Sequence, residues 1–138
     1  MASRPFSVGV PAEFVTPDGK IREGLGWDSF APTGIPWSPI PTVDGKWSAE
    51  SLSLHPAYLL GTALVTPAAI AAADPAPLVR ARFGIGTDTV DMDGCTRRDT
   101  IVAITPDGTA RPMAVGALAY ILASTLQMHV KDEAVRCG

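Results

Sequence analysis

Short apolar runs alternate with helix-forming segments along most of the chain. The predicted strands cover residues 6–10, 35–40, 61–65, 78–83 and 100–104. The predicted helices cover residues 48–53, 67–73, 92–98 and 112–130. Strands that alternate with helices are typical of βαβ units and a parallel sheet. The pattern therefore predicts an α/β protein with a mainly parallel sheet and a long C-terminal helix.

Local signals support several of these elements. Thr66 is a good N-cap for the helix that follows, and Pro67 fits its first turn, where the missing N–H costs nothing. Asp91 is a suitable cap for the helix over residues 92–98. The strand over residues 35–40 contains two prolines, which restrict it to an edge of the sheet.

The C-terminal segment has the strongest helical pattern. Pro112 is placed at a helix start, and residues 113–130 contain no helix breaker except Gly116. The first three turns are apolar all round, which predicts that this part of the helix is covered on most sides.

A competing interpretation is an all-β protein. Four Asp-Gly pairs, at positions 18–19, 44–45, 93–94 and 107–108, are each compatible with a hairpin turn. The helices expected after Thr66 and after Pro112 fit that interpretation badly, so the α/β fold is favoured.

Composition narrows the class of protein. The 138 residues carry a net charge of −3, and 18% of them are charged. That length suits one domain with a real core. Without a basic stripe to meet phosphates, no nucleic-acid partner is expected. The apolar run over residues 113–123 is far shorter than the roughly 20 residues that span a bilayer, and the N-terminus does not resemble a signal peptide. A cytoplasmic protein without a membrane partner is the expectation.

The sequence Gly84-Ile85-Gly86 is the main candidate for chemistry. It follows a predicted strand, and glycines at the carboxyl end of a parallel strand let a ligand approach backbone N–H groups. Taken alone, a Gly-x-Gly is a weak signal, and a plain tight turn is the better explanation of it. No Gly-x-Gly-x-x-Gly occurs in the chain, so it contains no dinucleotide fingerprint.

Other polar residues have simpler explanations. Asp88, Asp91 and Asp93 lack the spacing and the closing Glu of a calcium loop, so helix capping and turn formation explain them better. His55 and His129 have no partner at an interpretable spacing, and surface or packing roles are expected. No metal site is predicted.

Taken together, residues 78–138 resemble the D-isomer-specific 2-hydroxyacid dehydrogenases. Residues 84–91 are similar to the family's Gly-Val-Gly-x-Asp-x-Val-Asp. Next come residues 95–98 before a strand, and then Thr-Pro-Asp-Gly at 105–108, which leads to residues 111–114 and a long apolar helix. The order and spacing of these pieces carry the resemblance, and residues 1–77 match only loosely.

The resemblance implies a flavodoxin-like, three-layer fold for a single domain over residues 1–138, namely the substrate-binding (catalytic) domain of such an enzyme. The chain is expected to end at the hinge to a nucleotide-binding domain, which carries the catalytic Arg, Glu and His. The intact enzyme would use NAD or NADP to interconvert a D-2-hydroxy acid and its 2-oxo acid. This chain alone is expected to bind no cofactor and to be inactive.

The resemblance also assigns roles to residues of this chain. Backbone N–H groups of Gly84, Ile85 and Gly86 would bind the substrate carboxylate. Thr109, Pro112 and Met113 would face the nicotinamide, although Thr109 stands where the family commonly has Asn. Asp99 stands where many members have Gly, and Asp can still adopt a left-handed conformation.

Two further expectations concern association. An exposed apolar surface is expected where the absent parts would pack, and patches of this kind usually mark interfaces. A homodimer along the 112–130 helix is therefore predicted. The alternative to an oxidoreductase is a non-catalytic binding or assembly module that keeps the fold.

Overall fold

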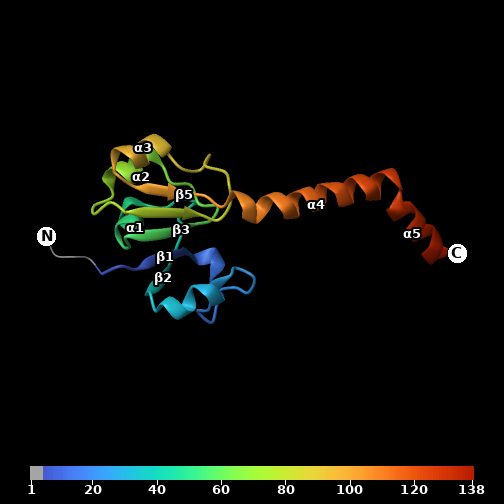
Figure 1. Cartoon of the computed structure of the whole chain (residues 1–138), viewed down its shortest axis with the longest axis horizontal. Helices are drawn as coiled ribbons and strands as arrows, with labels where there is room; N and C mark the ends of the chain where they lie inside the picture. Colours follow the sequence, from blue (N-terminus) through green and yellow to red (C-terminus); the bar gives the residue numbers. More distant parts are fainter. Residues whose placement is uncertain (1–4) are drawn as a thin grey trace. The chain divides into compact units, whose positions relative to one another are not determined.

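The computed structural model describes residues 5–138, which fall into two compact units. The first unit runs to Ile104 and contains the sheet. The second unit, Thr105–Gly138, contains the two C-terminal helices. Figure 1 shows the elements of both units.

The first unit is built on a five-stranded sheet in which every pair of neighbouring strands is parallel. The strands are β1 (Val8–Pro11), β2 (Trp37–Ile40), β3 (Ala57–Leu60), β4 (Val79–Arg82) and β5 (Ile101–Ala103). Their spatial order is β2-β1-β3-β4-β5, the order of flavodoxin-like folds. The α/β prediction is confirmed, and the all-β alternative is wrong. The strand with two prolines, β2, lies at an edge, as predicted.

Three short helices lie together along the sheet (Figure 1). They are α1 (Ala49–Ser53), α2 (Pro67–Ala72) and α3 (Met92–Arg97). Each is capped as its sequence requires: Ser48, Thr66 and Asp91 accept hydrogen bonds from backbone N–H groups three residues on.

The core fills the space between these helices and the sheet. Leu52, Ile70 and Cys95 from the helices join Tyr58 and Leu60 of β3 in one buried cluster. All five are at most 1% exposed. The apolar positions of the three helices face the sheet because that contact removes them from water.

The opposite face of the sheet has a thinner cover. Val79 and Ala81 of β4 point away from the core and line a cavity of about 210 Å³ together with Trp27 and Phe30. Trp27 belongs to the 3-10 turn η2 (Trp27–Ser29), and Phe30 lies between η2 and the next 3-10 turn, η3 (Ala31–Thr33). A third short turn, η1 (Ala12–Phe14), follows β1. The third layer of the fold thus consists of 3-10 turns in the first unit.

His55 joins the amino ends of three strands. Its Nδ1 lies 2.8 Å from Ser7 Oγ, and its Nε2 lies 2.8 Å from Ser38 Oγ. Ser7 precedes β1, Ser38 belongs to β2, and His55 precedes β3. The imidazole therefore links the amino ends of these strands, at the end of the sheet that lies away from the candidate site.

The strand predicted over residues 61–65 is wrong. The strand of this region is β3, which lies just before the predicted range: it starts directly after Pro56 and ends before Gly61. Residues 64 and 65 make only isolated bridges, to Lys46 and Val90. Ala63 and Val65 are nevertheless buried. The apolar run thus predicted the burial of Ala63 and Val65, which lie in a loop rather than in a strand, whereas Thr62 and Leu64 are exposed.

The C-terminal unit begins earlier than predicted. Helix α4 spans Pro106–Thr125, so Pro112 lies inside the helix and not at its start. Pro106 occupies the first turn instead, a position that also needs no N–H donor. Gln127, with a φ of 49°, separates α4 from α5 (Met128–Cys137). The single helix predicted over residues 112–130 is therefore two helices.

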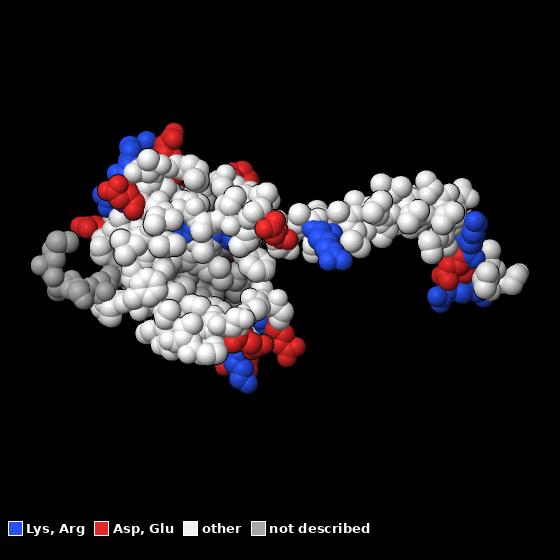
Figure 2. Space-filling model, in the orientation of Figure 1, with Lys and Arg blue, Asp and Glu red and all other residues white. Residues whose placement is uncertain are grey.

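No residue of α4 is buried in the structure. Tyr120 is 79% exposed, and Met113 is 72% exposed. The prediction that this helix is covered on most sides is wrong for the chain described here. Figure 2 shows few charged groups along the visible face of α4 beyond its first turns.

Among residues 5–138, no single helix is long and apolar enough to cross a membrane. Helices α4 and α5 reach that length and composition only when taken together, with a bend of 57° between them.

Candidate functional site

Three loops meet at the carboxyl edge of the sheet. The loop after β1 contains Glu13 and Phe14, the loop after β3 contains Gly61 and Thr62, and the loop after β4 contains residues 83–86. Glu13 Oε1 lies 3.3 Å from both the backbone N and the Oγ1 of Thr62. The Phe14 and Phe83 rings pack edge to face at 5.5 Å. In this strand order, ligands bind outside the carboxyl ends near the junction of β1 and β3.

The Gly84-Ile85-Gly86 loop lies at this edge, as expected from its position after a parallel strand. Gly84 has a φ of 135°, a conformation that glycine adopts most readily. The N–H of Gly84 donates to Arg82 O at 3.0 Å. Among the described residues, the N–H groups of Ile85 and Gly86 have no hydrogen-bond acceptor. The loop thus has two backbone donors to offer, whereas the sequence suggested three.

Arg82 holds this loop in place. Its Nε donates to Gly86 O at 3.0 Å, and its Nη1 donates to Gly61 O. One guanidinium therefore binds the loops after β3 and β4 through their carbonyl oxygens. Sequence reasoning missed this role, because an Arg at the end of a strand gives no signal of what its side chain binds.

The three residues assigned to the nicotinamide side lie in the second unit. Thr109, Pro112 and Met113 are at positions i, i+3 and i+4 of α4, so they share one face of the helix. Thr109 is half-buried, and Pro112 and Met113 are exposed. This face suits contact with a flat ring. It offers one hydroxyl and no cationic group, so it does not fit the diphosphate of a dinucleotide.

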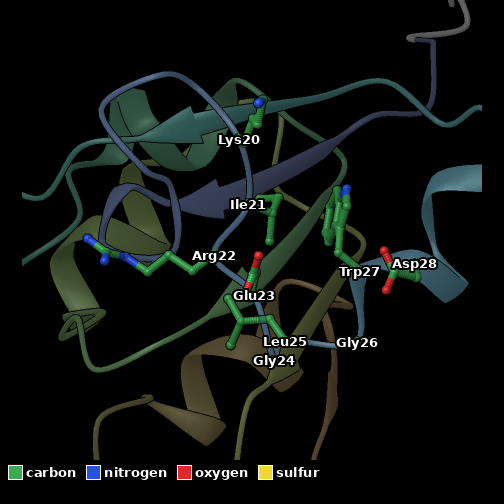
Figure 3. A pocket seen from close by; sticks show the side chains of 9 residues that line it. All are labelled: Lys20, Ile21, Arg22, Glu23, Gly24, Leu25, Gly26, Trp27 and Asp28. Carbon is green, nitrogen blue, oxygen red and sulfur yellow. The ribbon is translucent and has the colours of Figure 1, made fainter.

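A hollow of about 600 Å³ lies beside the loop after β1. Residues 20–28, from one irregular loop, line it, and Figure 3 shows basic and acidic side chains on its wall. Arg22 Nε donates to Glu13 O at 2.7 Å, which ties this loop to the carboxyl edge. The sequence pattern gave no indication of the hollow.

Of the acidic residues considered for calcium, Asp91 has the helix-capping role expected of it. Asp91 caps α3 and lies 3.7 Å from Arg97. Within the described part of the chain, no group of three or more His, Cys, Asp or Glu side chains could hold a metal ion.

Arg80 and Cys95 form an unusual pair in the core. Arg80 is fully buried, and its Nη1 lies 3.4 Å from Cys95 Sγ. Among the residues that the structure describes, its Nε and Nη2 have no hydrogen-bond partner. Burial lowers the pKa of Arg80 below its usual value. Burial also raises the pKa of the Cys95 thiol, against the opposing effect of the Arg80 charge.

These observations define an α/β protein with a candidate anion-binding loop at the carboxyl edge of a flavodoxin-like sheet. No protein-family model matches the chain. Over 97 residues it is 34% identical to the D-3-phosphoglycerate dehydrogenases of Mycobacterium leprae (strain TN) and Mycobacterium tuberculosis (strain ATCC 25618 / H37Rv). The match covers 68% of this chain and 18% of each relative.

The similarity supports part of the resemblance inferred from residues 78–138. D-3-Phosphoglycerate dehydrogenase belongs to the D-2-hydroxyacid dehydrogenases, the family to which those residues are similar. Because the chain matches less than a fifth of its relatives' length, the assignment of its residues to one domain of such an enzyme stays a prediction.

Proposed function

We propose that this chain is the substrate-binding part of an oxidoreductase that interconverts a D-2-hydroxy acid and its 2-oxo acid with NAD or NADP. The similarity to D-3-phosphoglycerate dehydrogenases supports the class of enzyme. The two unused N–H groups of the loop after β4 carry the proposal for this chain, because they lie where α/β sheets bind ligands.

In this mechanism the chain binds and orients the acid. The N–H groups of Ile85 and Gly86 donate to the substrate carboxylate, and hydrogen bonds to a charged acceptor are the stronger kind. Arg82 binds Gly86 O and Gly61 O and so holds the loops after β4 and β3 together. Ile85 is 57% exposed and would pack on the substrate's carbon chain.

When bound, NAD or NADP would supply or accept the hydride, and Thr109, Pro112 and Met113 offer its diphosphate no cationic group. Thr109, Pro112 and Met113 would contact the nicotinamide ring through one face of α4. The catalytic Arg, Glu and His would come from the nucleotide-binding part of the intact protein. For that reason the chain alone is expected to show no dehydrogenase activity.

Titration of the ¹⁵N-labelled chain with pyruvate and D-lactate tests the binding role. We expect saturable shifts of the Ile85 and Gly86 amide signals, and none with lactamide, which has the same shape without the charge. Absence of shifts at these two residues, or equal shifts with lactamide, would overturn the proposal. Turnover of NADH with 2-oxo acids by the purified chain would overturn the expectation of inactivity.

Exposed α4 favours a second candidate, an assembly module. Leu118 and Tyr120 are 59% and 79% exposed on a helix with few charges. We propose that α4 associates with a second copy, which would make a homodimer, or with the nucleotide-binding part. Light scattering that shows a monomer at high concentration would contradict the homodimer. Association without any acid binding would favour the assembly module over the oxidoreductase.

A further inference from the structure

Apolar side chains lie at the carboxyl edge directly beside the proposed acid-binding loop. Phe83, the residue before Gly84, is 49% exposed, and Ile85 in the loop itself is 57% exposed. Because consecutive Cα atoms are roughly 3.8 Å apart, the Cα atoms of Phe83 and Ile85 are separated by at most about 7.6 Å. Both side chains are therefore within reach of a small acid held by the Ile85 and Gly86 N–H groups.

Phe14 extends these apolar side chains toward the neighbouring loops. Its ring packs edge to face on the Phe83 ring, with the centroids 5.5 Å apart. A Cβ built on Gly61 would lie 3.3 Å from Phe14 Cζ, so the tip of the ring lies against the loop after β3. Phe14 is half-buried, so part of its ring stays open to solvent. We call these three side chains the Phe14–Phe83–Ile85 surface.

The position of this surface distinguishes it from ordinary exposed apolar residues. Apolar side chains that are scattered singly over a protein surface are common and need no explanation. These three adjoin two backbone N–H groups that have no acceptor among the described residues. Ligand sites typically combine an apolar wall with a few polar groups that fix the orientation of the ligand.

The charged groups at this edge are of both signs. Arg82 binds the two loop carbonyl groups described above, and the carboxylates of Glu13 and Asp88 lie against neighbouring glycines. The hollow beside the loop after β1 adds two cations and two acids, from Lys20, Arg22, Glu23 and Asp28. Figure 3 shows the Lys20 and Arg22 side chains extending in different directions. Because the acids offset the cations, the apolar surface is the feature that distinguishes one substituent of a bound acid from another.

We propose that the Phe14–Phe83–Ile85 surface selects 2-hydroxy acids whose carbon 3 carries an aromatic or branched apolar group. The inference rests on the proposed function and names its substrate class. With the carboxylate on the Ile85 and Gly86 N–H groups, such a substituent packs on the rings and leaves water. Removal of roughly 60 Å² of apolar surface from water strengthens binding about tenfold.

The proposed class differs from the substrate that names the relatives, which are D-3-phosphoglycerate dehydrogenases. D-3-Phosphoglycerate carries a phosphate on carbon 3, where the proposed class carries an apolar group. Phenyl rings and an isoleucine side chain contain no hydrogen-bond donor for a phosphate. The surface of this chain therefore suits an apolar substituent better than a charged one.

Acids that share the 2-hydroxycarboxylate group test the proposal. D-Lactate, D-2-hydroxyisocaproate and D-phenyllactate differ only in the group on carbon 3, and D-3-phosphoglycerate supplies the charged alternative. Amide shifts of Ile85 and Gly86 in the ¹⁵N-labelled full chain give the dissociation constants. We expect D-phenyllactate to bind about tenfold more tightly than D-lactate, with D-2-hydroxyisocaproate between them. Intermolecular NOEs should join the ligand ring to Phe14 and Phe83.

Leucine variants test the contribution of each ring. Phe14→Leu and Phe83→Leu keep an apolar side chain and remove an aromatic contact. Each is expected to lower the preference for D-phenyllactate over D-lactate from about tenfold to about threefold. Phe6→Leu is the matched control, because Phe6 is 48% exposed and precedes β1 at the amino end of the sheet. This variant should keep the full preference, and a folded amide spectrum confirms that the variants are comparable.

The outcomes separate the two proposals. Equal affinity for D-lactate and D-phenyllactate, or tighter binding of D-3-phosphoglycerate than of D-phenyllactate, would show that the apolar class is wrong while the acid-binding role stands. A preference that survives in both leucine variants would exclude Phe14 and Phe83 as its cause. If no acid shifts the Ile85 and Gly86 amides, the acid-binding role itself is wrong, and the substrate class with it.

Discussion

Two arginines on one strand illustrate how position decides the effect of a charge. Arg80 is fully buried, and within residues 5–138 two of its three side-chain nitrogens have no hydrogen-bond partner. Arg82, two residues on, is half-buried and binds two carbonyl oxygens. A buried charge that lacks a partner destabilises a protein, whereas hydrogen bonds from a charged donor stabilise it.

The same substitution at these positions is therefore expected to act in opposite directions. Arg80→Met should increase the free energy of unfolding by about 1–4 kcal/mol, the range seen when apolar residues replace buried ionic groups. Arg82→Met should decrease it by about 1–2 kcal/mol, because two carbonyl groups lose their donor. Urea unfolding of both variants measures the difference. Destabilisation of similar size in both would show that Arg80 is fully satisfied in solution.

Cys95 predicts a pH dependence of stability. Burial raises the pKa of its thiol above the ordinary value of 9.0. The unfolded chain then loses its proton at a lower pH than the folded chain, so the stability present below about pH 9 declines as the pH rises further. Arg80 contributes with the opposite sign, because burial lowers its pKa.

Urea unfolding between pH 7 and pH 10.5 tests this dependence. Cys95→Ala is expected to remove part of the decline above pH 9, whereas Cys137→Ala, which changes an exposed thiol, should leave it intact. An identical decline in the wild type and in Cys95→Ala would contradict the assignment.

At the scale of elements, local signals predicted the fold where a cap or a strand-breaking residue fixed it. Ser48, Thr66 and Asp91 cap helices close to the predicted positions. Asp99 has a φ of 52°, the left-handed conformation that the sequence comparison required of it. The carboxyl-end position of residues 84–86 followed from the parallel sheet.

What the sequence could not predict depends on contacts between distant residues. The 61–65 run forms no strand, although Ala63 and Val65 are buried. Gly61 O and Thr62 N bind Arg82 and Glu13 instead of a neighbouring strand. The role of Glu13 required knowledge that residues 49 positions apart in sequence are adjacent. The hydrophobic periodicity of a sequence indicates burial and local propensity. It does not indicate which distant residues are in contact.

The start of α4 is open to a direct test with two prolines. Pro112 lies inside the helix, where it removes a hydrogen bond and costs about 3 kcal/mol, whereas Pro106 lies in the first turn. Pro112→Ala is expected to increase helicity and to slow hydrogen exchange over residues 106–112. Pro106→Ala should change little. If the helix began at Pro112, as the sequence suggested, the first variant would have no more effect than the second.

At the scale of the whole molecule, the sheet unit contains the complete core. The buried cluster runs from Ile40 to Cys95, and α4 and α5 contribute no residue to it. A chain truncated after Ile104 is therefore expected to keep its free energy of unfolding to within about 0.5 kcal/mol.

The same truncation tests the role of α4 in association. The full chain should sediment as a dimer or larger assembly, and the truncated chain as a monomer. Loss of cooperative unfolding on truncation would show that α4 or α5 stabilises the sheet unit. Self-association that survives truncation would move the interface to the sheet unit, where Ile101 is 64% exposed.

The guanidinium that joins Gly61 O to Gly86 O has one more consequence. Two segments anchored to one rigid, planar group share its displacement, so neither can rearrange alone. Any molecule that reorders the backbone at Gly86 must also disturb Thr62. The hydrogen bond from the Thr62 N–H to Glu13 Oε1 would change with it. A reporter placed at position 62 would thus sense occupancy at a neighbouring segment that it never touches.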